Sequence, residues 1–320
     1  MEKNMYNPDR KKRFIKSYTT NLRTARSCES AFRAIGQFEE DRQADICTWS
    51  EEDIRPVTDQ ILGVRESSKW NRLCILKAYC KWCVGQGIEG ATDAMQSIDG
   101  GSEEALKPKM VANPVHLQIY LDSVFAPESQ QTISNTFRAY FWLAYSGMKE
   151  EEVLKVKASD VDLKAMTVTY GGVVFQLYKE GMDAVRNCVE LSSFRYVHPM
   201  YEPKWIERAA ANGELLRGFR GAPVYDVIRS QISRATTAAQ AEGRTDMALS
   251  FSRAWLSGMF YRVYELERAG IDPDFAGIAD MYMRGNTYTH YGKDNSKYKR
   301  MTLIRNYHKD YVRWKAAFDA

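Results

Sequence analysis

The sequence contains no long apolar segment. No uncharged run approaches the roughly 20 consecutive apolar residues that a membrane-spanning helix needs, which excludes a membrane protein. The first residues, MEKNMYNPDRKKRFIKSY, carry charges where a signal peptide has its apolar core, so we expect no secretion. The sequence therefore predicts a chain that folds in water.

Cysteine is also scarce. Six cysteines in 320 residues are too few for a disulfide framework, and we therefore expect the reducing cytoplasm. Two of them, Cys80 and Cys83, form a Cys-x-x-Cys pair. A structural zinc site needs two further Cys or His ligands at short spacing, and none lies nearby in the sequence. We predict no metal and interpret both thiols as core residues of a helix.

The sequence is rich in apolar residues, and both of its ends are basic. Apolar residues make up 44% of the chain, enough for the cores of two ordinary domains. The net charge is +4, and residues 1–20, with six basic and two acidic side chains, account for all of it. Residues 293–315 are basic as well. The basic residues of both segments could bind the phosphate backbone of a nucleic acid, although an ordinary solvent-exposed surface gives the same charge pattern.

The first half of the chain has helical periodicity throughout. Apolar spacing predicts helices over Ser27–Glu40, Ser50–Gly63 and Ser67–Gly85, each beginning near a capping serine. A Gly-, Ser- and acid-rich stretch follows and predicts a linker. The predicted parts are a basic N-terminal tail (1–17), a helical domain (18–90), a linker (91–113) and a second domain (114–320).

The third predicted helix has two distinct faces. We expect Trp70, Leu73, Cys80 and Val84 to point into the core. The polar face is basic and could meet phosphates, whereas an ordinary solvated face is the alternative. The residues of this candidate DNA-binding face are Arg65, Lys69, Arg72, Lys77 and Lys81.

The second half mixes helices with a β-hairpin. We predict helices over Pro114–Ser123, Gln131–Ser146 and Lys149–Val156. Alternating apolar residues on both sides of Gly171-Gly172 then predict a tight hairpin. We expect a further strand over Cys188–Leu191 and helices beyond Glu202.

Four segments of the second half occur in an order and spacing that resemble the catalytic domain of tyrosine recombinases, the phage-integrase family. They are SGMKEEEVLKVKASDVDL, the hairpin, SFSRAWLSGMFYRVYELERAGID and THYGKDNSKYK. In the first half, SSKWNRLCILKAYCKWCVGQG resembles the core-binding domain of that family. The resemblance implies a mainly α chain of two domains: an all-α, SAM-like core-binding domain, then an α+β catalytic domain with a small antiparallel sheet.

The resemblance also implies a reaction and partners. In the family a tyrosine attacks the scissile phosphate and forms a 3′-phosphotyrosyl link, without ATP or metal, so we expect no cofactor. Arginines grip the phosphate and a lysine protonates the leaving oxygen. The implied partners are attachment sites in double-stranded DNA and further copies of the chain in a tetrameric synapse. The implied location is the nucleoid of a bacterial or phage-infected cell, with no membrane association.

Two short motifs match the family in part. Ser-Gly-Met-Lys stands where the family has Thr-Gly-Leu-Arg, so Lys149 replaces the first arginine and lacks its bidentate grip. Glu152 matches the carboxylate that follows that arginine in the family. In the second motif, His-x-x-Arg, Arg253 is retained and Ser250 replaces the histidine. A serine hydroxyl can bond a phosphate but cannot accept a proton as an imidazole does.

The nucleophile and the lysine are matched less closely. Tyr291 is our first choice for the nucleophile and Tyr288 the second, while Tyr282 stands where the family has another His or Trp. The hairpin turn has no lysine, so Lys179, after the second strand, is the candidate. The alternative is that all three are tyrosines of the core, because a chain with 19 tyrosines can match the family positions by coincidence.

Two functions follow from these matches and mismatches. The first is a site-specific recombinase or integrase of a phage or mobile element, and the alternative is a catalytically impaired, recombinase-fold DNA-binding protein. A third possibility is an RNA-binding or purely structural helical protein whose resemblance is accidental.

Overall fold

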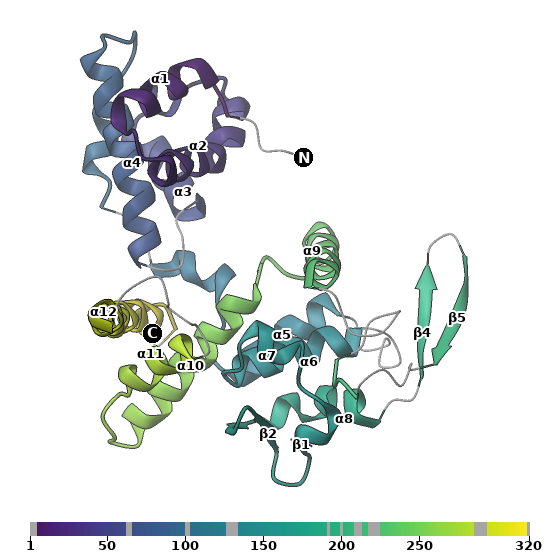
Figure 1. Cartoon of the computed structure of the whole chain (residues 1–320). Helices are drawn as coiled ribbons and strands as arrows, with labels where there is room; N and C mark the ends of the chain where they lie inside the picture. Colours follow the sequence, from purple (N-terminus) through teal and green to yellow (C-terminus); the bar gives the residue numbers. More distant parts are fainter. Residues whose placement is uncertain are drawn as a thin grey trace. The chain divides into compact units, whose positions relative to one another are not determined.

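The computed structural model describes residues 5–61, 66–99, 103–125, 134–190, 193–198, 201–207, 213–216, 225–284 and 293–318. The chain divides into two compact units (Figure 1). The first unit comprises Met1–Leu106 and His308–Ala317, and the second comprises Lys107–Tyr307 and Phe318–Ala320. Most described residues are helical, and the strands form two small antiparallel sheets. The predicted fold class, mainly α with a small antiparallel sheet in the second domain, is confirmed.

The first unit is all-α, as predicted. Its helices and turns are α1 (Pro8–Tyr18), α2 (Leu22–Arg42), η1 (Ile46–Thr48), α3 (Glu51–Ile61), α4 (Glu66–Gly85), η2 (Ala94–Ser97) and most of η3 (Glu103–Lys109). Asn21 caps α2, because its side chain accepts hydrogen bonds from the backbone N–H groups of Arg23 and Thr24. The helix therefore begins earlier than predicted, and Ser27 lies inside it.

An aromatic cluster occupies the core of this unit. The ring centroids of Phe14, Phe32 and Tyr79 lie 4.9–5.9 Å apart in edge-to-face pairs, a favourable aromatic geometry. Phe14 belongs to α1, so the prediction that residues 1–17 form a tail is wrong for the described part of that segment. An apolar residue every few positions makes α1 amphipathic, and burying Phe14 and Ile15 holds the helix on the core.

The predicted inner face of α4 is only half right. Leu73 and Cys80 are buried, whereas Trp70 and Val84 are 45% and 44% exposed. The buried stripe passes through Leu73, Leu76, Cys80 and Cys83 at alternating intervals of three and four residues. Trp70 is three residues before Leu73 and Val84 is four residues after Cys80, so periodicity predicts both as inner positions, but they lie beyond the two ends of the buried stripe.

The first part of the predicted linker belongs to the core. Met95 and Ile98 are buried among the core residues of the first unit. The backbone N–H of Thr92 donates to the carbonyl of Cys47 over 2.7 Å. The high content of small and acidic residues suggested a linker, but two apolar side chains are enough to hold this stretch on the helices.

The second unit contains the remaining helices and both sheets. They are α5 (Pro114–Val124), α6 (Ser134–Tyr145), α7 (Glu150–Val153), η5 (Ala158–Asp160), β1 (Val161–Asp162), β2 (Thr167–Tyr170), β3 (Val173–Gln176), η6 (Lys179–Gly181), α8 (Met182–Glu190), β4 (Ser193–His198), β5 (Tyr201–Glu207), α9 (Tyr225–Ala241), α10 (Phe251–Arg268) and α11 (Phe275–Met283). The last helix, α12 (Lys293–Phe318), supplies residues to both units.

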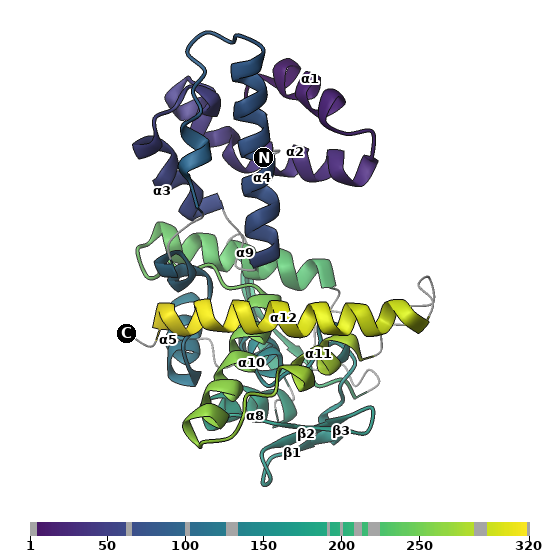
Figure 2. The same cartoon turned by 90° about the vertical axis from the view of Figure 1, so that its left-hand side faces the viewer.

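The predicted hairpin is formed by β2 and β3. Tyr170 pairs with Val173, and the two intervening glycines have φ of 57° and 77°, the left-handed values that glycine tolerates. β1 adds a third antiparallel strand on the other side of β2, and Figure 2 shows the three strands side by side.

Two predictions for the following segment are wrong. Cys188 lies in α8, where Met182, Val185 and Cys188 are buried at a helical spacing of three. β5 occupies residues that we expected to be helical beyond Glu202, and it pairs antiparallel with β4. That pairing depends on a second segment, so the local pattern of β5 alone did not reveal it.

The crossing of α6 and α10 positions both candidate motifs. A Cβ atom at Gly258 would lie 1.9 Å from the carbonyl oxygen of Tyr145, so only glycine permits this close approach. Trp255 Nε1 donates to the carbonyl of Gly147 over 3.0 Å, and Arg262 Nη2 donates to that of Ser146 over 2.8 Å. The end of α6, which leads into the first motif, is thereby fixed against the helix that carries the second.

Candidate nucleic-acid interface

The first motif begins at a sharp turn after α6. Gly147 has φ of +99°, and a Cβ atom there would lie 2.8 Å from the terminal methyl carbons of Met259 and Met281. Lys149 then caps α7, with its backbone N–H donating to Glu152 Oε2 over 2.8 Å. The Ser-Gly-Met-Lys sequence therefore supplies a left-handed turn, and the side chain of Glu152 then caps the start of α7 by accepting from the backbone N–H of Lys149.

An arginine from a distant part of the sequence completes this cluster. Arg284 donates from Nε to Glu152 Oε1 over 3.0 Å and from Nη2 to Glu152 Oε2 over 2.8 Å. Its guanidinium also lies 4.9 Å from the ring centroid of Phe175. The Lys149 ammonium donates a hydrogen bond to the carbonyl oxygen of Arg284. The two side chains that match the family's first motif thus both contact Arg284.

Arg284 is a residue that the sequence analysis missed. It directly follows α11 and stands in no motif, so no local signal distinguishes it from the chain's other arginines. Its contact with Glu152 spans 132 positions of the sequence, and only the fold brings the two together.

The second motif lies at the start of α10. Ser250 is the N-cap of that helix, where its hydroxyl accepts from the backbone N–H of Arg253 over 3.4 Å. Arg253 Nη1 donates to the carbonyl of Ala248 over 2.8 Å. The serine that replaces the family's histidine therefore has a helix-capping role, and the retained arginine contacts the main chain beside it.

The other predicted catalytic residues lie apart from these contacts or outside the described residues. Tyr282 is packed in an aromatic group, with its ring centroid 6.2 Å from those of Trp255 and Tyr307. Lys179 is exposed at the start of η6. Tyr288 and Tyr291, the candidate nucleophiles, lie outside the described residues.

The predicted basic face of α4 is largely used within the first unit. Lys69 is 7% exposed, Arg72 donates to the carbonyl of Ile61, and Lys77 Nζ donates to that of Gln96 over 2.9 Å. Burial lowers the pKa of Arg72. Lys81 is exposed, and Arg65 lies outside the described residues. The expectation of one exposed basic face fails because these long side chains reach main-chain acceptors at the end of α3 and in η2.

A different basic surface lies on α1 and the first turns of α2. The sequence has seven basic residues and no acidic one from Arg10 to Cys28. Arg10 and Lys11 pair with the buried carboxylates of Asp45 and Glu39. The other five are exposed, and we call them the α1–α2 cations: Lys12, Arg13, Lys16, Arg23 and Arg26.

In the second unit, α9 presents a polar outer face. Its inner face buries Ile228, Ile232, Thr236 and Ala239. The outer face carries hydroxyls and guanidinium groups, which can donate hydrogen bonds to phosphates and base edges. Its exposed polar residues include Arg229, Ser230, Ser233, Arg234 and Thr237.

The thiols of Cys80 and Cys83 are buried, as expected of core residues. Burial raises the pKa of Cys80, which keeps this thiol protonated. Among the described residues, no group of three or more His, Cys, Asp or Glu side chains is arranged to hold a metal ion. No helix in that same part of the chain is long and apolar enough to cross a membrane.

Comparison with known proteins gives a family match for the first unit. Residues 5–86 match the family model described as MrpR, N-terminal core-binding domain. The predicted resemblance of the N-terminal helices to a core-binding domain is thereby confirmed, and the match includes α1. A search of curated proteins finds no matching sequence.

Several solved structures of recombinases and integrases are similar over most of the chain. XerA recombinase is 13% identical, with 93% of this chain and 98% of that chain covered and a TM-score of 0.37. The integrase from mycobacterium phage Brujita is 16% identical, with 96% of each chain covered and a TM-score of 0.35. A lambda integrase dimer bound to a COC' core site is 12% identical, with coverages of 92% and 77% and a TM-score of 0.36.

Proposed function

We propose that this chain is a DNA-binding protein with the domain plan of the tyrosine recombinases, and that it binds duplex DNA without cutting it. The family match of residues 5–86 supports a core-binding domain at the N-terminal end. The α1–α2 cations and the polar outer face of α9 supply donors for phosphates, the groups that dominate affinity for DNA.

The proposal that the chain does not cut DNA rests on one contact: the ammonium of Lys149 donates to the carbonyl of Arg284. Cleavage requires positive donors placed around the scissile phosphate, where they stabilise developing charge. Here the residue at the first arginine position is a lysine that bonds the main chain, and the neighbouring Glu152 is neutralised by Arg284.

Ser250 supports the same conclusion. A hydroxyl that caps α10 has no basic nitrogen, so it cannot replace the proton acceptor that the family's histidine supplies. The lysine expected in the hairpin turn is also absent, since the turn is Gly171-Gly172.

The second candidate function is an active recombinase or integrase of a phage or mobile element. Arg253 and Glu152, which match the family motifs, favour it. In this alternative Tyr291 or Tyr288 attacks the DNA, Arg253 and Lys149 contact the phosphate, and four copies assemble in a synapse. The tetramer and a nucleoid location stay predictions.

A covalent-trapping experiment separates the two functions. A binding site is first selected from random duplexes with the full chain and then rebuilt with a nick, so that a cleaving enzyme stays attached to the DNA. We expect a shifted complex on a native gel and no covalent adduct on a denaturing gel. An active tyrosine recombinase on its own nicked site is the positive control.

The variants Tyr291→Phe and Tyr288→Phe complete the design. We expect both to bind the selected site as the unsubstituted chain does. A covalent adduct that disappears in one of them would establish cleavage and identify the nucleophile, and the proposal of binding without cutting would then be wrong.

A further inference from the structure

The turn between α1 and α2 exposes two large apolar side chains. Leu22, the first residue of α2, is 77% exposed, and Tyr18, the last residue of α1, is 44% exposed. Burial of a leucine side chain stabilises a protein, and a leucine that stays in water does not contribute that stabilisation. A single exposed leucine is ordinary, so the surroundings of this one decide what it means.

The surroundings are basic on both sides of the turn. Of the five α1–α2 cations, three precede Tyr18 on α1 and two follow Leu22 on α2, and all five are exposed. No acidic residue occurs from Arg10 to Cys28. Charge complementarity therefore favours an anionic partner for this surface, and the two apolar side chains lie within the segment that such a partner would contact.

Local contacts hold the turn in one conformation. The backbone N–H of Asn21 donates to Thr19 Oγ1 over 3.1 Å, and the side chain of Asn21 caps α2. The ring of Tyr18 stacks on the buried ring of Phe14, with 5.1 Å between centroids and 25° between planes. A turn that is already fixed loses little conformational freedom on binding, so it is suited to present Leu22 to a partner.

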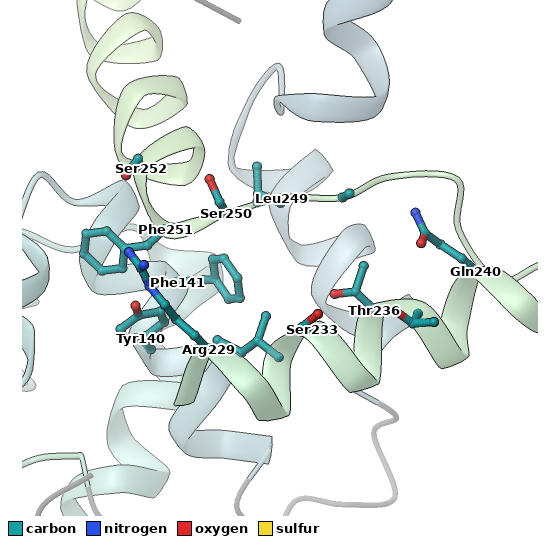
Figure 3. A pocket seen from close by; sticks show the side chains of 13 residues that line it. Tyr140, Phe141, Arg229, Ser233, Thr236, Gln240, Leu249, Ser250, Phe251 and Ser252 are labelled. Carbon is teal, nitrogen blue, oxygen red and sulfur yellow. The ribbon is translucent and has the colours of Figure 1, made fainter. Parts of the chain in front are cut away.

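The other candidate DNA surface, the outer face of α9, is built differently. Phe141 and Phe251 line a cavity beside Arg229 and Ser233 (Figure 3), but both rings are buried. A duplex on α9 can therefore reach the donors and not these rings. An aromatic or leucine contact with DNA is thus expected from the α1–α2 turn of the first unit.

Duplex DNA has an apolar surface that this turn can reach. The minor groove is about 6 Å wide, too narrow for an α-helix of about 10–12 Å but wide enough for single side chains of a turn. Proteins that bend DNA insert leucine or other apolar side chains there between neighbouring base pairs, which unstacks one step and kinks the duplex. Cations on both sides of the inserted side chain can then hold the phosphates of the bent duplex.

We propose that the α1–α2 turn is a DNA-bending wedge: Leu22 enters the minor groove between two base pairs and kinks the duplex, while Tyr18 packs on the adjacent sugar. Pyrimidine–purine steps unstack most easily, so the bound site should carry a TA or CA step at this position. The inference rests on the proposed function, because it states how the first unit holds the DNA that is proposed as its partner.

A fluorescent base tests the wedge. The duplex selected with the full chain is rebuilt with 2-aminopurine in place of adenine at each pyrimidine–purine step in turn, and the fluorescence of this base rises when it unstacks. We expect binding to raise the fluorescence at one step. Leu22→Ala should abolish the rise and weaken binding at least about tenfold, because alanine buries much less apolar surface. Leu22→Met, with a side chain that such wedges also use, should retain both.

The salt dependence of binding separates the wedge from the phosphate contacts. Leu22 carries no charge, so Leu22→Ala should lower the affinity and leave the slope of log affinity against log salt unchanged. Val84→Ala truncates an exposed apolar side chain on α4 of the same unit and is the matched control. It should change neither the fluorescence nor the affinity. Circular dichroism checks that each variant is folded.

Two results would overturn the wedge and leave the proposed function intact. They are binding without a fluorescence rise at any step, and a rise that persists in Leu22→Ala. Vesicles of phosphatidylglycerol and phosphatidylcholine in equal parts provide a further arm. If the chain binds them through Leu22 while Leu22→Ala binds DNA normally, the turn contacts a membrane and the wedge is wrong. Failure of the full chain to bind any duplex would instead contradict the proposed function, and the wedge with it.

Discussion

At the scale of single residues, the contact between Lys149 and Arg284 decides how the first motif is interpreted. A lysine that binds a DNA phosphate should contribute to DNA binding and cleavage, whereas a lysine that bonds the main chain should contribute to the free energy of unfolding. The structure gives the second kind of contact, since the ammonium donates to a carbonyl 135 residues away in sequence.

Substitution of Lys149 separates these roles. We expect Lys149→Ala to lower the free energy of unfolding by about 1 kcal/mol, the usual contribution of such a hydrogen bond, while affinity for duplex DNA changes less than about twofold. Urea denaturation and fluorescence anisotropy provide the two measurements. Lys155→Ala removes an exposed lysine six residues away and is the control. A large loss of DNA affinity with unchanged stability would place Lys149 on the phosphate instead.

The second residue-scale feature is the buried pair of Lys11 and Glu39. Both side chains are fully buried, and Glu39 also accepts from the backbone N–H of Ile46 over 3.0 Å. Burial raises the pKa of Glu39 to about 7, and the positive charge of Lys11 opposes that rise. The carboxylate of Asp45, which faces Arg10 and the hydroxyl of Tyr79, raises this pKa further.

The raised pKa of Glu39 predicts a pH dependence of stability. Between about pH 4.5 and pH 7 the unfolded chain releases the Glu39 proton while the folded chain retains it, so stability falls as the pH rises through this window. The loss should reach a few kcal/mol, because one pKa unit corresponds to about 1.4 kcal/mol. The measurement is urea denaturation of the full chain at pH 4.5, 6.0 and 7.5.

Glu39→Gln provides the comparison, since a neutral amide has no such titration. The difference in unfolding free energy between the original chain and Glu39→Gln should shrink or reverse as the pH rises. A constant difference across the window would show that Glu39 titrates alike in the folded and unfolded chains.

At the scale of elements, the α1–α2 cations predict how the first unit meets DNA. Each lysine or arginine that neutralises a phosphate releases counterions and contributes about 0.9 to the slope of log affinity against log salt. We expect Lys16→Ala with Arg23→Ala to weaken binding to any duplex and to reduce that slope by about 2. Fluorescence anisotropy at four or more salt concentrations measures both effects.

Two controls make the result specific to this surface. Lys164→Ala removes an exposed lysine near the β1–β2 turn of the second unit and should leave the salt slope unchanged. Lys81→Ala tests the exposed residue of the α4 face that the sequence predicted. If Lys81→Ala reduces the salt slope and the double substitution of Lys16 and Arg23 does not, then DNA binds to the α4 face that the sequence predicted.

Elements with local signals were predictable from the sequence. The β2–β3 hairpin follows from alternation around two glycines, and the helices α3, α4, α5 and α6 follow from apolar periodicity. The β4–β5 pair was missed although its strands are neighbours in the sequence, because we expected a strand over Cys188–Leu191 and helices beyond Glu202. The basic residues of α1 resembled a tail because burial of Lys11 depends on Glu39, 28 positions further along the chain.

The same distinction applies to the candidate site. The sequence identified Lys149, Glu152, Ser250 and Arg253 because short motifs carry them. It did not identify Arg284, which contacts two of them, because an isolated arginine has no motif. Motifs thus predicted which residues belong together and not what those residues contact.

At the scale of the whole molecule, α12 connects the end of the chain to its beginning. Residues up to Tyr307 belong to the second unit, and those from His308 to Ala317 belong to the first. Tyr311 and Trp314 are buried and their rings stack, with 6.0 Å between centroids. Arg313 pairs with Glu103 over 2.9 Å. The last turns of α12 therefore group with the first unit, and an ion pair that spans 210 positions of the sequence joins them to it.

Removing these turns should destabilise the first unit. We expect Trp314→Ala to lower the stability of that unit by about 3–5 kcal/mol, the usual cost of deleting a buried tryptophan side chain, and deletion of residues 308–320 to cost at least as much. Hydrogen exchange of the amides of α2 and α4 in the full chain measures the effect where it should occur. Val312→Ala, which truncates an exposed side chain between the two buried rings, is the control and should leave exchange unchanged. If α2 and α4 exchange at the same rate with Trp314→Ala as without it, the first unit is complete without the end of the chain. The apolar stripe of α12 would then be available to pack elsewhere, for example on a second copy of the protein.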